Sequence, residues 1–188
     1  MKQKITRYMD CELRSEGDSN VIEGNAVVFN RVADMGWFDE EIDPSAFQRT
    51  DMSDVVLNLN HDNNMIFAGT RNGSLELEVK ETGVYQKSSI IDTTQGRDVL
   101  KLVKSGLIRS MSFAFTIADG GEYWETRNGR EYRRITDIDR LYDVSLVVFP
   151  AYPQTWARAN SDELAEKHKA LMERRAEQEK RMKELVHD

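Results

Sequence analysis

The strongest constraint on the fold is the rhythm of the first 160 residues, where short apolar runs alternate with turn residues about every ten positions. Runs of this length and spacing are typical of β-strands joined by tight turns. The turn signals include Asn72-Gly73, Gly120-Gly121 and Asn128-Gly129, which are dipeptides that favour tight turns between strands. We therefore expect a mainly β domain. The predicted strands cover residues 27–30, 55–60, 74–79, 84–91, 110–117, 131–135 and 144–149.

One stretch, TTQGRDVLKLVKSGL, departs from this pattern. Val99, Leu102 and Val103 recur there at helical spacing after Asp98, and Gly106 stands where a helix would end. The pattern predicts a short helix that leads into the next strand. Strands joined by turns, with few helices, indicate the α+β class, built on an antiparallel barrel or sandwich.

The composition changes near residue 160. Residues 161–188 contain none of the three prolines and none of the eleven glycines, and are mostly Ala, Glu, Lys, Arg, Leu and Met. Ser161 is a candidate N-cap, and Asp162 and Glu163 follow it where the helix dipole favours negative charge. We expect a domain at 1–160 and a helical extension at 161–188. The extension is equally compatible with a docking or removable segment and with a solvated surface helix.

The composition excludes several classes of protein. The 188 residues include one cysteine, which cannot form an internal disulfide and argues against a zinc finger. With 26 basic and 33 acidic residues the net charge is -7, which argues against broad phosphate neutralisation on a nucleic acid. The chain has no apolar run of about 18 residues and no apolar stretch near its start. We therefore expect no nucleic-acid partner, no membrane partner and no export.

His61 is the histidine whose surroundings indicate chemistry, because His168 and His187 lie in the polar C-terminal segment. It follows the run 55–60, whose odd positions are apolar, so strand parity places His61 on the apolar face. A histidine in this place is either a structural residue or a proton carrier, since imidazole titrates near neutral pH.

The segment 110–117 has a methionine and two phenylalanines on one face and small residues, among them Ser110 and Ser112, on the other. Small residues leave room for a substrate carbonyl to approach a hydroxyl. A serine becomes a good nucleophile only when an adjacent base removes its proton. From spacing alone, two serines on a strand are more often ordinary edge or hairpin residues than catalytic ones.

Asp143 enters the predicted strand 144–149, where an unpaired buried charge would be costly. It therefore needs a partner. Pairing with the imidazole of His61 would be functional, because a carboxylate there fixes the tautomer of the ring and stabilises its charged form. An arginine would make the pair structural, and the candidates are Arg109, Arg133, Arg134 and Arg140.

Six segments between residues 20 and 157, taken in order, resemble the caudovirus prohead proteases. These serine endopeptidases mature the procapsids of tailed bacteriophages and are distantly similar to the herpesvirus assemblin proteases. The segments are GNAVVFNRV, WFDEEIDPSAF, LNHD, GTRNGSLELEVKETGVY, GLIRSMSFAF with the helix before it, and DVSLVVFPAYPQT. The resemblance implies an antiparallel β-barrel of the herpesvirus-protease type followed by the helical extension.

The resemblance assigns roles to particular residues. The nucleophile of the family falls on Ser112, its base on His61 and its acid on Asp143, where many relatives carry glutamate. Ser110 matches no catalytic position of the family. Ala114 stands where glycine is usual, which reduces backbone freedom beside the nucleophile but leaves the hydroxyl of Ser112 in place.

The resemblance also implies a biological role. It implies that the enzyme works inside the assembling procapsid in the bacterial host cytoplasm, without a cofactor or a metal. Its substrates would be the scaffolding segment of the phage major capsid protein or a scaffold protein, and the protease itself. A homo-oligomer is a further expectation. The competing hypotheses are a non-catalytic shell component that binds capsid or scaffold protein and, with less support, a metal-dependent hydrolase using His61 and Asp62.

Overall fold

The computed structural model describes residues 2–10, 13–15, 19–148 and 169 of the chain. In this part of the chain no helix is long and apolar enough to cross a membrane. The elements are β1 (Ile5–Asp10), β2 (Val21–Val28), β3 (Ala33–Asp34), β4 (Phe38–Ile42), η1 (Pro44–Phe47), β5 (Val56–Leu59), β6 (Asp62–Gly69), β7 (Leu75–Lys80), β8 (Gly83–Ser89), α1 (Thr94–Lys104), β9 (Ser110–Ile117), β10 (Glu122–Arg127), β11 (Arg130–Ile135) and β12 (Ile138–Val147).

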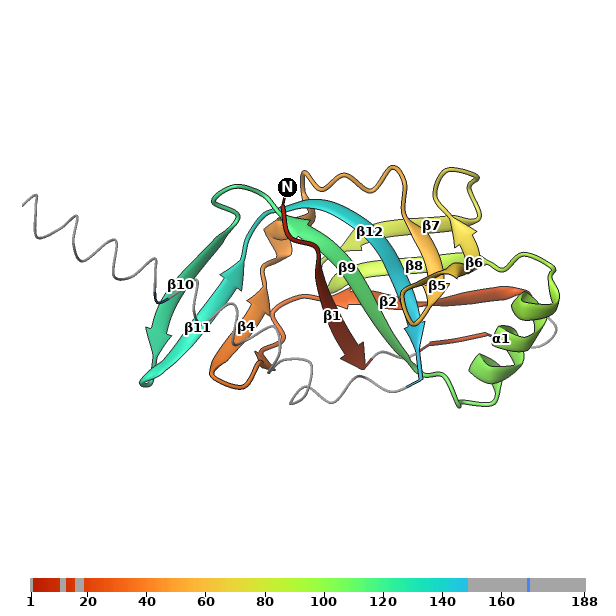
Figure 1. Cartoon of the computed structure of the whole chain (residues 1–188), viewed down its shortest axis with the longest axis horizontal. Helices are drawn as coiled ribbons and strands as arrows, with labels where there is room; N and C mark the ends of the chain where they lie inside the picture. The colour runs from red at the N-terminus through yellow and green to blue at the C-terminus, as the bar shows by residue number, and fades with distance from the viewer. Residues whose placement is uncertain (1, 11–12, 16–18, 149–168, 170–188) are drawn as a thin grey trace, which may run out of the picture.

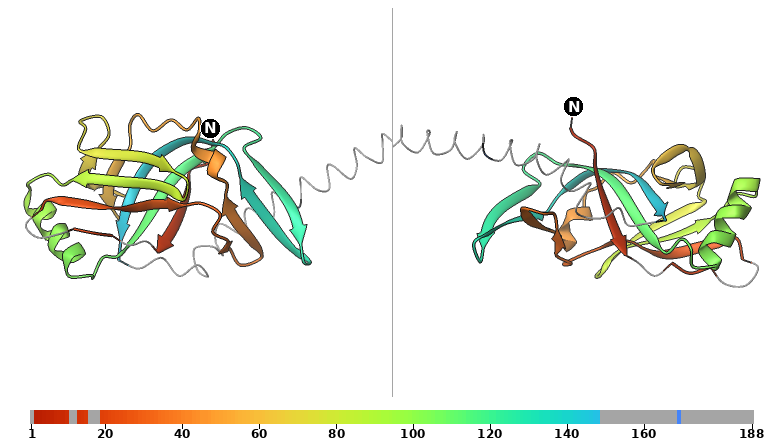
Figure 2. Two further views of the ribbon diagram at one scale, coloured as in Figure 1. Left: turned by 180° about the vertical axis from the view of Figure 1, so that it is seen from behind. Right: turned by 60° about the horizontal axis from the view of Figure 1, so that its bottom comes forward.

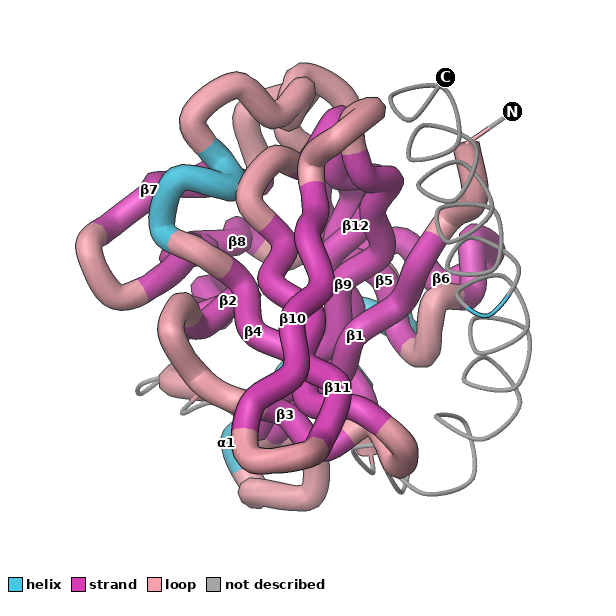
Figure 3. The backbone as a smooth tube through the Cα atoms, turned by 90° about the vertical axis from the view of Figure 1, so that its left-hand side faces the viewer, coloured by secondary structure: helices cyan, strands magenta, loops and turns pink. Residues whose placement is uncertain are grey.

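The strands form three sheets, of which the largest is five-stranded with the order β1-β9-β12-β5-β6. A four-stranded sheet has the order β10-β11-β4-β3, and a three-stranded sheet has the order β2-β8-β7. Figure 1 shows β9 and β12 running through the middle of the molecule, with the β10–β11 hairpin at one end and α1 at the other. The two views in Figure 2 agree on this arrangement, and Figure 3 looks along the molecule from the hairpin end.

The mainly β fold with few helices is confirmed, but two details of the predicted fold class are not. Among the described residues the pairings close no barrel, because β1 and β6 are the two edges of the five-stranded sheet. Pairing is also not purely antiparallel, since β12 pairs with β5, and β11 with β4, in parallel. Apart from Lys169, the predicted extension at 161–188 lies outside the described residues.

All seven predicted strands correspond to observed strands, and 110–117 matches β9 at both ends. The largest errors in length are at β2, which begins six residues before the predicted 27–30, and at β12, which begins six residues before the predicted 144–149. The sequence pattern missed β1, β3, β4, β6 and β10. In β4 the reason is visible, because its FDEEI sequence is acidic and its carboxylates are paired with arginines of β11.

The predicted helix is α1, which begins at Thr94 instead of after Asp98. The side chain of Thr93 caps its first turn by accepting a hydrogen bond from the Gly96 amide. Val99 and Val103 are buried in the core, whereas Leu102 has 37% of its surface exposed. Gly106 follows the helix in the left-handed region, with φ of 74°, as expected of a residue that ends a helix.

The hydrophobic core joins the five-stranded and three-stranded sheets. The apolar side of β9 and β12 contributes Phe113, Phe115 and Val144, and β2 and β8 contribute Val27 and Val84, all without exposed surface. Side chains of α1 complete the cluster. Because this face of β9 is used for the core, the opposite face is the one left for other groups.

A buried ion network attaches β1 to the four-stranded sheet. Glu40 on β4 accepts hydrogen bonds from Arg7 on β1, at 2.7 Å to Nη2, and from Arg133 on β11, at 3.0 Å. The side chains of Glu40 and Arg133 are almost fully buried. Burial alone would raise the pKa of Glu40, but the two guanidinium groups outweigh it and hold that pKa below its ordinary value.

Replacing Glu40 should therefore destabilise the fold in a pH-dependent way. Glu40→Gln takes the carboxylate from the guanidinium of Arg7 and leaves the buried guanidinium of Arg133 with Glu122 alone, so we expect a loss of about 3 kcal/mol in the free energy of unfolding at pH 7. The depressed pKa means that the wild-type contribution is present above about pH 4.3, the pKa of an unfolded glutamate, and is lost as the pH falls further. Urea unfolding at pH 7 and at pH 3.5, roughly one unit below that pKa, should show the difference shrinking at the lower pH.

Glu78→Gln is the matched control, because Glu78 pairs with Lys80 at the surface. We expect that variant to change stability by less than about 1 kcal/mol. A Glu40→Gln loss that is equally small, or equally large at both pH values, would contradict the assignment.

Candidate active site

Ser112 lies in the centre of β9 and points away from the hydrophobic core. Its neighbours Met111 and Phe113 belong to the core, so alternation puts Ser112 on the opposite face, as predicted. In the sheet, Ser112 is paired with Ser145 of β12 on one side and with Tyr8 of β1 on the other. Ser112 itself is fully buried.

Asp143 reaches the same face as Ser112 because of a bulge in β12. Leu141 is paired with Phe115 of β9, yet Asp143 is paired with Ala114, so two steps along β12 match one step along β9. Tyr142 is the extra residue. In a regular strand Leu141 and Asp143, two residues apart, would share a face; the bulge leaves Leu141 in the core and turns Asp143 to the face of Ser112.

His61 lies in the two-residue turn between β5 and β6, and the predicted strand parity is wrong at this position. Asn60 and His61 both have positive φ, 52° and 59°, so the extended strand ends at Leu59 and its alternation stops there. The imidazole consequently does not join the apolar side chains of β5. It extends over the neighbouring strand β12 toward β9.

The three side chains meet in one hydrogen-bonded row. The distance from His61 Nε2 to Ser112 Oγ is 2.6 Å, and the distance from His61 Nδ1 to Asp143 Oδ1 is also 2.6 Å. An ionised carboxylate can only accept a hydrogen bond, so the protonated nitrogen is Nδ1 and its N–H donates the hydrogen bond to Asp143. In the neutral ring Nε2 is then an acceptor for the Ser112 hydroxyl. The structure therefore brings together all three residues singled out in the sequence.

The partners of Asp143 are His61 and a lysine. Its second oxygen, Oδ2, accepts from Lys4 Nζ at 3.1 Å. Three of the four candidate arginines are paired elsewhere: Arg133 with Glu40, Arg134 with Glu41 and Asp43, and Arg140 with Asp51 and Asp54. The structural alternative for Asp143, an arginine partner, is therefore wrong for these three residues.

The N-terminal strand β1 and Lys4, the residue just before it, contact the three members of the row, which the sequence pattern did not indicate. Besides the contact of Lys4, the backbone oxygen of Arg7 accepts from Ser112 Oγ at 2.9 Å. The ring of Tyr8 lies edge-on to the His61 imidazole, with 6.0 Å between centroids. Burial and the charge of Asp143 raise the pKa of Tyr8. The N-terminal sequence MKQKITRYMD is mainly polar, so its pattern gave no indication of a strand beside the site.

The serine hydroxyl has one proton and two acceptors, Nε2 of His61 and the oxygen of Arg7. Donation to Nε2 is the arrangement in which the base can remove the proton. Ser110 lies on the same face two residues earlier, also buried, and is paired with Asp10 and Val147. The hydroxyl that is hydrogen-bonded to Nε2 of His61 is that of Ser112.

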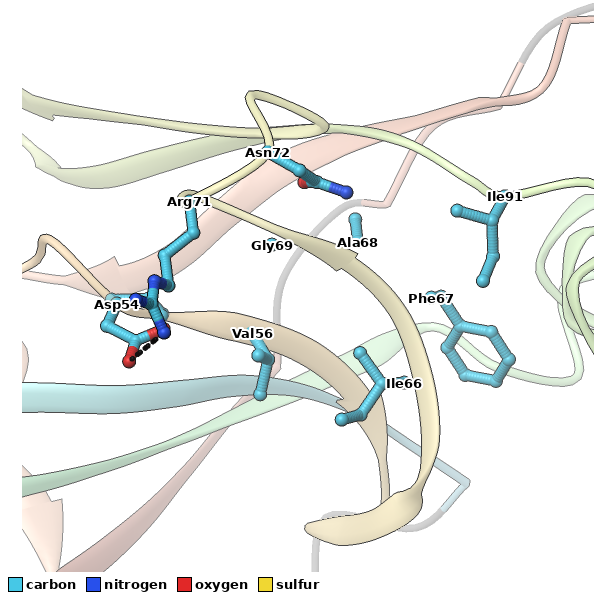
Figure 4. Close-up of a pocket in the computed structure, with 10 residues that line it drawn as sticks. Asp54, Val56, Ile66, Phe67, Ala68, Gly69, Arg71, Asn72 and Ile91 are labelled. Atoms are coloured by element: carbon cyan, nitrogen blue, oxygen red, sulfur yellow. Dashed lines mark ion pairs between the residues drawn. The ribbon is translucent and has the colours of Figure 1, made fainter.

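In the described part of the chain, no group of three or more His, Cys, Asp or Glu side chains is arranged to hold a metal ion. A cavity of about 300 Å³ lies along β5 and β6, away from the row of Ser112, His61 and Asp143. Figure 4 shows its apolar lining of Val56, Ile66, Phe67 and Ile91, and the ion pair of Asp54 with Arg71 at its rim.

The sequence matches the family model of the caudovirus prohead serine proteases over residues 9–170. The chain belongs to this family. The match includes all six segments on which the resemblance was based, so the resemblance is confirmed. Family membership indicates a serine peptidase connected with capsid maturation.

The fold resembles that of a solved phage protein. The capsid assembly protease gp21 of bacteriophage T4 superposes with a TM-score of 0.50, at 12% sequence identity, over 77% of this chain and 97% of gp21. At this identity the likeness concerns the fold alone. A search of curated proteins found no match.

The tautomer of His61 can be measured without any substrate. We expect 15N NMR of the purified protein to show a protonated Nδ1 and an unprotonated Nε2 at pH 8, because Asp143 faces Nδ1 as an acceptor. In Asp143→Asn the amide can present either its oxygen or its NH₂ group, so the preference for one tautomer should weaken. A proton on Nε2 in the wild-type protein would contradict the described hydrogen bonds.

Proposed function

We propose that this member of the family is a prohead maturation endopeptidase that cleaves proteins with a triad of Ser112, His61 and Asp143. The observation that carries the proposal is the continuous hydrogen-bonded row from Ser112 through His61 to Asp143, with both contacts at 2.6 Å. A nucleophile, a base and an orienting carboxylate in this order are what acyl transfer requires. Membership of a serine protease family supports the same chemistry.

In the proposed mechanism, Ser112 Oγ attacks the carbonyl carbon of the scissile peptide while its proton passes to His61 Nε2. Asp143 holds the ring in the required tautomer and stabilises the imidazolium that forms. The imidazolium then gives its proton to the leaving nitrogen, the peptide bond breaks, and an acyl-enzyme remains on Ser112. A water molecule, deprotonated by His61, attacks the ester and releases the second product.

Burial makes this arrangement effective. The Asp143 side chain has 3% of its surface exposed and the His61 side chain 18%. In such a poorly hydrated site the attraction between a carboxylate and an imidazolium is screened much less than in water. Lys4 contacts the second oxygen of Asp143, so the buried carboxylate has a positive partner besides the imidazole.

The proposed substrates are the scaffolding segment of the major capsid protein, or a scaffold protein, inside the assembling procapsid. This part of the proposal rests on the family. The chain itself is a further proposed substrate, with the cut separating a protease domain at 1–160 from the extension at 161–188. A homo-oligomer inside the procapsid is compatible with the proposal, since a closed compartment concentrates the enzyme.

The alternative is a shell component that binds capsid or scaffold protein without cleaving it. That hypothesis expects no spatial relation between Ser112 and His61, which lie 51 residues apart in the sequence. Their direct hydrogen bond favours catalysis. The metal-dependent hydrolase is not favoured, because the imidazole of His61 is directed at Ser112 and Asp143 and not at Asp62.

Substitution of the nucleophile or the base should abolish cleavage. Ser112→Ala and His61→Ala should each lower kcat on the co-expressed capsid precursor by a factor on the order of 10⁴ or more, because the triad acts as a unit. The Ser112→Ala protein should also fail to react with a fluorophosphonate probe. Gel analysis of the capsid precursor and mass spectrometry of the labelled protein measure the two effects.

Ser110→Ala is the matched control, since Ser110 is a buried serine on the same face of the same strand. It should keep cleavage and labelling near the wild-type level. A dead Ser110→Ala variant beside an active Ser112→Ala variant would reverse the assignment of the nucleophile, and labelling of neither serine would favour the shell component.

Self-processing is tested by the mass of the purified chain. The active protein should accumulate as a shortened form that ends near residue 160, whereas Ser112→Ala should stay at its full length. Intact-mass spectrometry after expression without other phage proteins distinguishes the two. An active protein that remains full length would exclude rapid self-cleavage of the extension.

A further inference from the structure

The strand that carries Asp143 also contacts His61 at a second point. The backbone N–H of His61 donates to Ser145 Oγ, with 2.9 Å between the nitrogen and the oxygen. Ser145 is fully buried and lies between Ser112 of β9 and Asn58 of β5 in the register of the sheet. Nothing in the roles assigned so far uses this hydroxyl.

The turn that carries His61 needs an external anchor. The backbones of Asn60 and His61 lie in the left-handed region, which residues other than glycine adopt uncommonly. The adjoining strands are irregular, because the register of β5 with β6 shifts on both sides of Asn58. The turn is held from β12 instead: the Asn60 N–H donates to the Leu146 oxygen at 2.9 Å, and the His61 N–H donates to Ser145.

Asp143 and Ser145 are two residues apart on β12, beyond the bulge, so they point to the same face of the sheet. One side chain fixes the ring of His61 at Nδ1, and the other fixes its backbone nitrogen. The contact with the backbone nitrogen fixes the position of the His61 main chain, and the contact with Nδ1 fixes the orientation of its ring. The distance from Nε2 to Ser112 depends on both.

We propose that Ser145 is a positioning residue for the base of the triad, a role that rests on the proposed function of His61. Ser145 acts through the backbone of His61, from whose N–H it accepts a hydrogen bond. The lone pairs of its oxygen are what the role requires. Among the described residues, the acceptors of its own proton are the backbone oxygens of Asn58 and Leu146, each distant at 3.4 Å.

The chemistry of the hydroxyl explains why a serine suits this position. An apolar residue would fill the same buried space but would leave the His61 N–H without an acceptor, which is unfavourable for a backbone group away from water. A threonine adds a methyl group that must find room at a fully buried position. Cysteine is close to serine in size and provides a weaker acceptor, so the loss of activity in Ser145→Cys should be intermediate.

The test compares Ser145→Ala and Ser145→Cys with Ser88→Ala. Ser88 is also a fully buried strand serine, and its hydroxyl donates to the Gln86 side chain on β8, in another sheet. The rate of Ser112 labelling by a fluorophosphonate probe reports the reactivity of the nucleophile without a known cleavage site. Cleavage of the capsid precursor supplies kcat and KM, and urea unfolding supplies the stability of each variant.

We expect Ser145→Ala to lower the labelling rate and kcat by about 10- to 100-fold, in line with losses from displaced catalytic groups, with KM changed less than about twofold. Ser145→Cys should lie between alanine and serine. Ser88→Ala should keep both rates even if its unfolding midpoint falls as far as that of Ser145→Ala. Rates that follow stability across the three variants would overturn the proposal and leave Ser145 as a structural residue.

Hydrogen exchange separates this inference from the proposed function. The His61 amide should exchange at least about tenfold faster in Ser145→Ala than in the wild-type protein, whereas in Ser88→Ala it should not change. This measurement requires no proteolysis. If Ser112→Ala abolishes labelling while Ser145→Ala reacts at the wild-type rate with a protected His61 amide, the positioning role is wrong and the triad stands. If Ser112→Ala still cleaves and is still labelled, the proposed function is wrong, and the positioning role fails with it.

Discussion

The antiparallel pairing of β9 with β12 is the contact on which the rest of the structure depends. One face of this pair supplies Phe113, Phe115 and Val144 to the hydrophobic core, and the other presents Ser112, Asp143 and Ser145. The two functions are compatible because side chains alternate across a strand. Each strand can therefore bury apolar residues on one side and hold polar residues rigidly on the other. The core in this way fixes the positions of the proposed catalytic groups.

The polar face is assembled from elements that are distant in the sequence. β1 lies along one edge of β9, and β5 lies beyond β12 with the turn that carries His61. The buried pairing of Glu40 with Arg7 and Arg133 connects β1 to the four-stranded sheet, and it costs the desolvation of three charged groups. We interpret this pairing as the contact that holds β1 beside Ser112. Tyr8 on β1 then contacts His61, and Lys4, just before β1, contacts Asp143.

His61 illustrates how a proposed catalytic residue departs from local preferences. Glycine adopts a φ of 59° more readily than histidine does. The apolar alternation of residues 55–60 also gives no indication that the strand ends at Leu59. The position is tolerated because neighbouring groups determine it: β12 bonds the backbone of the turn, and Asp143 and Ser112 bond the ring. Local strain that is supported by the surroundings is a recurrent property of functional sites.

The sequence by itself determined the strands whose apolar residues alternate, the helix α1 and, through the resemblance, the three residues that meet at the site. It could do so because alternation and helical spacing are local properties, and because Ser112, His61 and Asp143 lie in segments matched by the family model. Local patterns could not reveal β1 or β4, whose polar residues are paired by partners far along the chain. They also placed His61 on the wrong face and gave no sign of the bulge at Tyr142. Only the tertiary structure decided these points, because register and bulges are set by which strand lies alongside, and the face of each side chain follows from that pairing.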